Sequence, residues 1–182
     1  MAGGIYGVDG VQCFKRLVAQ NMKTKLTKQM EQSLVADALH KGKHPALEVL
    51  YWHTESIGQD VYRPVGQAEY IDAVIEKDGM FSCLELKVSM TDLHSKAAQS
   101  FVGNKNYLVC PLKMAKEIKK CNDPWIEKHP TVGIIAWNGK NQFQVIKHCK
   151  INYSLAQNDW TTLAKGMISS LSKEMKKLLE GA

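Results

Sequence analysis

The sequence predicts an α/β domain in which helices flank a mixed central β-sheet. Helical and strand periodicities alternate along the chain, in the order helix, strands, helix, strand, helix, hairpin, helix. Two hairpin signals, Asp78-Gly79 and Asn138-Gly139, each separate two apolar runs. The length of 182 residues suffices for one hydrophobic core. We therefore expect a single domain over residues 1–182.

Four segments have the periodicity of an amphipathic helix. In the first, apolar residues recur every four positions from Leu26 to Ala38, and Gly42 and Pro45 end the pattern. The last segment places Leu163, Met167, Leu171, Met175 and Leu178 on one face. We expect helices at about residues 24–40, 91–102, 112–121 and 161–179.

Strand patterns occupy the middle of the chain. Two apolar runs flank Lys77-Asp78-Gly79 and predict a hairpin. Residues 56–66 contain Gly58, Pro64 and Gly66 and predict an irregular loop. The predicted strands are residues 48–53, 68–76, 81–88, 106–110, 131–137 and 142–148. Residues 1–22 follow neither period, so we expect a flexible or weakly packed arm there.

The charge balance is compatible with a polyanionic partner. Lysine and arginine total 24 against 18 aspartates and glutamates, a formal net charge of +6. This balance favours DNA or RNA as a partner, although proteins that bind no nucleic acid often carry a similar charge. The start of the chain lacks a secretory pattern, and no apolar run approaches the roughly 20 residues of a membrane helix. We expect a cytoplasmic protein without a membrane partner.

The five cysteines form no C-x-x-C pair, and their number is odd. This pattern favours reduced thiols over a disulfide framework. Cys110, Cys121 and the pair His148-Cys149 are conceivable zinc ligands, but they lack the tight ligand pairs of structural zinc sites. Buried free cysteine is the simpler interpretation.

Two charged residues interrupt an apolar strand at Glu85 and Lys87. Side chains alternate along a strand, so both project from the same face. Burying them needs compensation from an ion pair or a bound metal. Asp72 lies in the partner strand of the hairpin, where two carboxylates can approach closely enough to share a divalent cation. The alternative is that Glu85 and Lys87 lie on the solvated face of an edge strand.

This set of side chains suits phosphodiester hydrolysis. Mg²⁺ and Mn²⁺ prefer oxygen ligands and retain several waters, so Asp72, Glu85 and the backbone carbonyl of Leu86 are candidate metal ligands. The metal would polarise the phosphate and lower the pKa of a bound water. Lys87 would orient that water or offset developing negative charge.

Glu31 is a further acidic candidate, because it falls among the core-facing residues of the first predicted helix. A metal ligand, direct or through water, explains this position as well as capping or an ion pair with a lysine does. Asp37 and Glu48 are weaker rivals for the same role.

These residues resemble the PD-(D/E)XK nuclease superfamily, whose core is a helix, a strand hairpin carrying D and E-x-K, a second helix and a further strand. The segments LELKVSMTDLHSK (residues 84–96), FVGNKNYLVCP (101–111) and VGIIAW (132–137) are similar to the MmcB-type proteins. These are small bacterial and phage-borne members associated with DNA repair. The resemblance covers roughly residues 68–147. It implies a restriction-endonuclease-like core, Mg²⁺ or Mn²⁺ as cofactor and DNA as partner.

By this resemblance Asp72, Glu85 and Lys87 take the catalytic positions, and Glu31 takes the acidic position of the first helix. Ile71 stands before Asp72, where the motif that names the superfamily has proline. The superfamily tolerates this departure widely.

A polar motif follows E-x-K in the family, and Ser89, Asp92 and Lys96 fall at its positions. Ser89, His94 and Lys96 are the candidates for contacts with nucleic acid. For Ser89 and Asp92 we favour capping of the helix that follows.

Lysines cluster on two of the predicted helices and could contact phosphates, although a solvated helix face explains them more simply. They are Lys113, Lys116, Lys119 and Lys120 on the third helix and Lys165, Lys173, Lys176 and Lys177 on the last. The four tryptophans, Trp52, Trp125, Trp137 and Trp160, could stack on unpaired bases, and we expect Trp137 in the core.

The leading hypothesis is therefore a metal-dependent deoxyribonuclease of DNA repair or phage DNA metabolism. A nuclease that cuts both strands often acts as a homodimer. One alternative is a non-catalytic nucleic-acid-binding module, whose binding would weaken with salt but ignore metal. The other is a protein-interaction module, such as a phage factor that blocks a host enzyme, which would not bind nucleic acid even at low salt.

Overall fold

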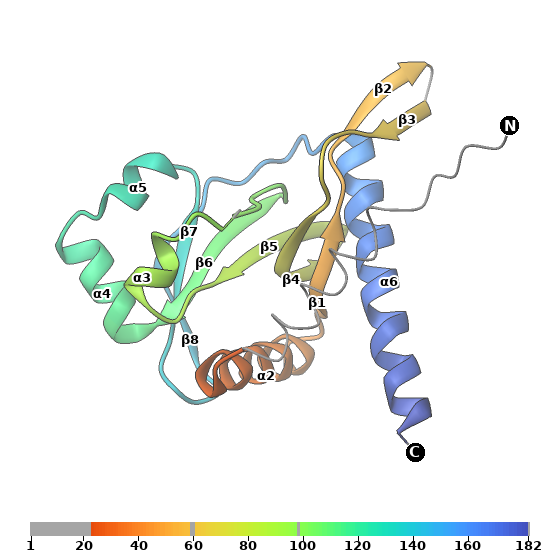
Figure 1. Ribbon diagram of the computed structural model, residues 1–182. Coiled ribbons are helices and arrows are strands. Elements are labelled where there is room, and N and C mark those ends of the chain that lie inside the picture. Colours follow the sequence, from red (N-terminus) through yellow and green to blue (C-terminus); the bar gives the residue numbers. More distant parts are fainter. Residues whose placement is uncertain (1–22, 59–60, 98, 182) are drawn as a thin grey trace, which may run out of the picture.

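A six-stranded mixed sheet forms the centre of the computed structural model, which describes residues 23–58, 61–97 and 99–181 (Figure 1). The strand order is β1-β4-β5-β6-β7-β8. β5, β6 and β7 run parallel, and the remaining neighbours are antiparallel. The predicted α/β class with a mixed, helix-flanked sheet is confirmed. The arm expected at residues 1–22 lies outside the described residues.

The strands of the central sheet follow the predicted pattern closely. They are β1 (His44–Tyr51), β4 (Glu69–Lys77), β5 (Met80–Leu86), β6 (Lys105–Pro111), β7 (Gly133–Trp137) and β8 (Phe143–Lys147). β1 begins before the predicted residue 48 and includes Pro45. Both predicted hairpins form, β4–β5 across Asp78-Gly79 and β7–β8 across the loop that contains Asn138-Gly139.

The loop prediction for residues 56–66 is wrong for residues 56–58 and 61–64, which are strands, whereas residues 65–66 lie in a loop and residues 59–60 lie outside the described residues. β2 (Thr54–Gly58) and β3 (Val61–Pro64) form a separate two-stranded sheet. Gly58 and Pro64 are the last residues of their strands, so neither interrupts the pairing. Opposite charges at Glu55 and Arg63 face each other across the hairpin and form an ion pair, which favours this pairing.

Five helices are described: α2 (Lys25–His40), α3 (Met90–Leu93), α4 (Leu112–Lys120), α5 (Pro124–Lys128) and α6 (Gln157–Glu180). α2 and α4 match their predictions. α5 was not predicted, and α6 begins at Gln157, ahead of the predicted residue 161. Among these described helices, none combines the length and apolar character needed to cross a membrane.

The helix predicted over residues 91–102 is wrong beyond its first turn. α3 ends at Leu93, and the chain returns toward β5 in an irregular path. The Ser100 N–H donates to the Glu85 carboxylate rather than to a helical carbonyl. Gly103 approaches β5 so closely that an added Cβ would lie 2.8 Å from the Phe81 carbonyl oxygen. These contacts to β5 outweigh the local helical pattern.

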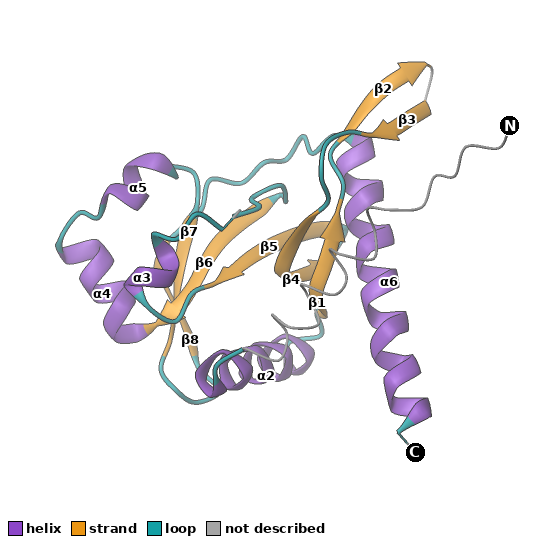
Figure 2. Cartoon of the chain, viewed as in Figure 1, coloured by secondary structure: helices purple, strands orange, loops and turns teal. Residues whose placement is uncertain are grey.

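Helices pack against the sheet in three places (Figure 2). Met30, Leu34 and Ala38 of α2 pack on Ala73, Leu84 and Leu86, whereas Leu163 and Met167 of α6 pack on Val49 and Phe81. Met114 and Ile118 of α4 and Trp125 of α5 pack with Leu108 and Ile134. The β4–β5 hairpin is therefore covered by α2 and α6 together, and that cover surrounds the candidate site.

α6 also covers the edge strand β1. The Ser170 hydroxyl donates to the Leu47 carbonyl, and the backbone at Gly166 touches the Leu50 carbonyl. Beyond this contact the predicted apolar face continues, but Leu171, Met175 and Leu178 are exposed. The hydrophobic face of α6 is thus buried only over its first half.

Candidate active site

The hairpin register places Asp72 opposite Glu85. The last paired residues of β4 and β5 toward the open end are Ala73 and Leu84, and Asp72 and Glu85 are the next residues on the two strands. The Leu86 N–H donates to Asp72 Oδ2 over 2.8 Å. The structure therefore brings together the two carboxylates that the sequence singled out, and one backbone N–H orients the first of them.

Glu85 is almost completely buried, with 2% of its surface exposed. Its Oε1 accepts a hydrogen bond from the Ser100 N–H at 3.1 Å, and its Oε2 lies 4.0 Å from Lys87 Nζ. Lys87 is itself buried, and its Nζ also lies 3.8 Å from Asp92 Oδ1. Glu85 and Lys87 do not lie on a solvated strand face, so that alternative is excluded.

Burial sets the protonation of the carboxylate pair. It raises the pKa of Glu85 to about 9, and the neighbouring charge of Asp72 adds to the rise, while the Ser100 N–H and Lys87 oppose it. Burial also raises the pKa of Asp72, against the hydrogen bond from Leu86 and the charges of Lys87 and Lys23. At pH 7 the pair therefore retains a proton.

A second acidic group lies beside this pair. Lys23 Nζ bonds to Glu31 of α2 and lies 2.6 Å from Glu48 Oε1 of β1. Burial acts to lower the pKa of Lys23, but these two partners outweigh it and the net pKa is raised. Burial also raises the pKa of Glu31, and the charges of Glu48 and Asp72 add to the effect. Glu31 is thus close to Asp72, and its predicted ion pair with a lysine is present.

Glu48 links the Lys23–Glu31 ion pair to the Asp72–Glu85 pair, because β1 pairs with β4. Its neighbours pair as Leu47 with Ala73 and Val49 with Ile71, which places Glu48 opposite Asp72. The Glu48 backbone has a φ of 51°, in the left-handed region that non-glycine residues rarely adopt. This unusual conformation occurs at the β1 residue that lies opposite Asp72.

The donor set of Asp72 and Glu85 fits a hard divalent cation. Mg²⁺ in proteins is commonly held by one or two carboxylates and keeps several waters. Across residues 23–58, 61–97 and 99–181, no three His, Cys, Asp or Glu side chains are grouped so as to hold a metal ion. A cation here would therefore have two protein carboxylates at most and complete its shell with backbone oxygen and water.

Two of the three predicted nucleic-acid contacts, Ser89 and His94, have local partners of their own. The Ser89 hydroxyl accepts from the Asp92 N–H at 3.1 Å and caps α3, as favoured above. His94 Nε2 lies 3.1 Å from Asp123 Oδ2, and Lys96 is exposed. Asp92 contacts Lys87, so α3 reaches the candidate site through that residue rather than through Ser89, His94 or Lys96.

Sequence reasoning missed Lys23 and Ser100. Lys23 precedes the first helix and carries no motif, and Ser100 lies in the segment predicted as helical. Ser100 also donates its hydroxyl to Glu69, whose Oε1 lies 3.3 Å from His53 Nε2. Only the return of the chain from α3 to β5 reveals that Ser100 bonds both Glu85 and Glu69.

Other sequence candidates have simpler roles. The four lysines of α4 are exposed, as expected for a solvated helix face, and Trp137 is buried in the core. Cys83 and Cys110 are buried, whereas Cys121 is exposed. These three cysteines and Cys149 form no disulfide with one another in the described part of the chain.

Comparison of the chain with protein-family models, with curated proteins and with solved structures found no match.

Proposed function

We propose that this protein is a divalent-metal-dependent nuclease that hydrolyses phosphodiester bonds in DNA, on a restriction-endonuclease-like core. The observation that carries the proposal is the buried pair Asp72 and Glu85 on adjacent strands, with Lys87 Nζ 4.0 Å from Glu85. The resemblance of the sequence supports a role in DNA repair or phage DNA metabolism as part of this proposal.

Charge balance supports a divalent cation as the cofactor. Among the described residues, the carboxylates Glu31, Glu48, Asp72 and Glu85 lie around two lysine ammonium groups, Lys23 and Lys87, and Lys87 also contacts Asp92 at the edge of the site. When these four carboxylates and the two ammonium groups are ionised, a net charge of two negative units remains, which Mg²⁺ or Mn²⁺ would neutralise. Asp72 and Glu85 would hold the ion, with the Leu86 carbonyl as a further ligand and Glu31 acting through water.

The protein's own groups would prepare the reaction in three ways. The N–H groups of Leu86 and Ser100 orient the two carboxylates, which is the usual task of groups around metal ligands. Lys87, held between Glu85 and Asp92, would offset the negative charge that develops on the phosphoryl group. A bound Mg²⁺ or Mn²⁺ supplies polarisation of the phosphate and a water of lowered pKa.

The decisive experiment incubates the protein with single-stranded and duplex DNA in Mn²⁺, Mg²⁺ or EDTA. Glu85→Gln and Lys87→Met are compared with matched exposed controls, Glu117→Gln and Lys113→Met of α4. We expect metal-dependent cutting that both site variants lose by about 10²-fold or more and both controls retain. Equal cutting by wild type and Glu85→Gln would refute the assignment.

One observation favours a second candidate, a non-catalytic nucleic-acid-binding module. Lys23 already bridges Glu31 and Glu48, so part of the acidic group is neutralised by the protein itself. A module of this kind would bind DNA equally well in EDTA and in Mn²⁺, and Lys87→Met would not change that affinity. Absence of cutting together with such binding would select this candidate.

A further inference from the structure

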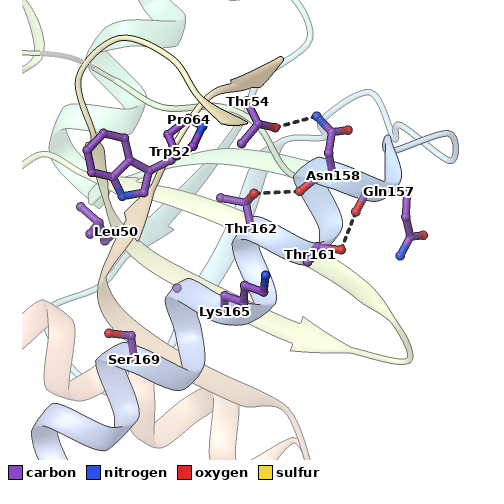
Figure 3. Close-up of a pocket in the computed structure, with 11 residues that line it drawn as sticks. Leu50, Trp52, Thr54, Pro64, Gln157, Asn158, Thr161, Thr162, Lys165 and Ser169 are labelled. Carbon is purple, nitrogen blue, oxygen red and sulfur yellow. Dashed lines mark hydrogen bonds between the residues drawn. The ribbon is translucent and has the colours of Figure 1, made fainter. Parts of the chain in front are cut away.

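A pocket lies between the end of β1, the base of the β2–β3 hairpin and the first half of α6 (Figure 3). Its volume is about 660 Å³. Trp52 and Pro64 line one side, and Asn158, Thr162 and Lys165 of α6 line the other. The pocket shares no residue with the candidate active site, although β1 runs through both.

Trp52 differs from the other three tryptophans in having no hydrogen-bond or stacking partner among the described residues. The indole N–H groups of Trp125, Trp137 and Trp160 donate to Gln99, the Lys140 carbonyl and the Gly79 carbonyl, respectively. Within the part of the chain that the structure describes, the Trp52 N–H donates no hydrogen bond and its ring stacks on no other ring. The side chain is 38% exposed at the mouth of the pocket. Its face is available to a planar ligand.

The α6 side of the pocket supplies hydrogen-bond acceptors. The hydroxyls of Thr161 and Thr162 donate to the Gln157 and Asn158 carbonyls, each over 2.8 Å, which leaves the oxygen lone pairs for a ligand. Asn158 Nδ2 donates to Thr54 Oγ1, so its amide oxygen remains an acceptor. These acceptor oxygens on α6 match the N–H groups on the edge of a nucleobase.

The pocket also has a positive charge without a matching acid. Lys165 is exposed, and no ion pair joins it to another described residue. None of the described residues that line the pocket is acidic. A ligand that combines a flat ring with an anion therefore fits this lining.

We propose that this pocket binds an unpaired nucleotide of a single-stranded nucleic acid, with the base on Trp52 and the phosphate at Lys165. The inference rests on the proposed nuclease function and specifies its substrate as single-stranded. To fill the pocket, a base must present both its hydrogen-bonding edge and its ring face. A base inside a duplex is paired and stacked, so it cannot present both. Trp52 directly follows Tyr51, the last residue of β1, and lies four residues after Glu48, roughly 13 Å along an extended chain. A bound strand could thus pass from the pocket toward Asp72.

The test measures binding of fluorescein-labelled oligo(dT) of about 12 nucleotides, a length typical of one single-strand site, by anisotropy in EDTA. Duplex DNA and dTMP serve as competitors. The variants are Trp52→Ala, Trp52→Phe and Lys165→Met, beside Lys173→Met, an exposed lysine of α6 outside the pocket. Circular dichroism confirms that each variant is folded.

We expect Trp52→Ala to weaken binding by roughly 5- to 150-fold, the loss that follows from removing one stacking platform, and Trp52→Phe to restore most of it. Lys165→Met should reduce the slope of log affinity against log salt concentration by about the amount that one phosphate contact contributes. Lys173→Met should leave this slope unchanged. Duplex DNA and dTMP should compete weakly.

Unchanged affinity in both Trp52→Ala and Lys165→Met would overturn the inference, as would dTMP or duplex binding as tight as that of oligo(dT). The proposed function fails separately. If Glu85→Gln binds oligo(dT) like the wild type and neither protein cuts DNA, the pocket stands and the nuclease assignment falls. If the wild type cuts DNA but Trp52→Ala binds oligo(dT) as tightly as the wild type does, the nuclease assignment stands and the pocket inference falls.

Discussion

Asp72 of β4 lies opposite Glu85 of β5, one residue beyond the last paired residues of the hairpin, Ala73 and Leu84. Burial of two adjacent carboxylates is unfavourable when both are ionised. Among the described residues, Lys87, Lys23 and the backbone N–H groups of Leu86 and Ser100 oppose this cost. This relationship makes the site sensitive to pH and to cations.

The stability of the protein should fall as the pH rises. The pKa of Glu85 is raised from 4.5 to about 9 in the folded state, so the folded protein binds more protons than the unfolded chain between these values. Stability is therefore greatest below pH 4.5 for this group and is lost as the pH approaches 9. In EDTA, Glu85→Gln should lack this loss and melt several degrees above the wild type at pH 9. Scanning calorimetry from pH 5 to 9 measures the melting temperature of both proteins. Melting temperatures that change in parallel with pH would contradict this prediction.

Binding of Mn²⁺ should release about one proton at pH 7, because a ligand carboxylate must be ionised to bind a metal and the buried pair retains a proton there. Titration calorimetry in two buffers of different ionisation enthalpy measures the release. The Glu85→Gln protein has no such proton to lose and serves as the control. A binding heat that is independent of the buffer would show that the pair is already ionised.

Lys23→Met should increase the response to Mn²⁺. The substitution removes the ammonium group that bridges Glu31 and Glu48, so the site becomes more negative. We expect a lower melting temperature in EDTA and a larger rise on adding Mn²⁺ than the wild type shows. Lys28→Met, at an exposed position of α2, is the matched control. Equal Mn²⁺-induced shifts in Lys23→Met and the wild type would mean that Lys23 does not influence the cation site.

Gly166→Ala should destabilise the protein, although glycine to alanine usually stabilises a helix by about 1 kcal/mol. The new methyl group would collide with the Leu50 carbonyl and with Val49 of β1. Overpacking of this kind costs about 1–3 kcal/mol, so the clash should win. Ser172→Ala on the exposed side of α6 is the control. Urea denaturation measures the free energy of unfolding of both variants. A Gly166→Ala protein more stable than the wild type would show that α6 can shift away from β1.

The hairpin that holds the site was predictable because its determinants are local. Asp78 and Gly79 have φ values of 53° and 77°, and Lys77 pairs with Met80 across them. This is the two-residue turn that an Asp-Gly pair favours. Turn and alternation together fix the register, and the register alone places Asp72 opposite Glu85.

The remainder of the site depends on contacts between residues far apart in the sequence. Lys23 reaches Glu48 only because α2 folds over β1 and β4, and Ser100 reaches Glu85 only because residues 94–97 and 99–102 do not continue the predicted helix. Helical preference over such a segment is worth only tenths of a kcal/mol per residue, less than satisfying a buried carboxylate. The sequence by itself therefore determined the strands of the central sheet, the β4–β5 hairpin and the carboxylate pair, but not the β2–β3 hairpin. Only the tertiary structure decided which groups surround the pair, because those contacts outweigh local preference.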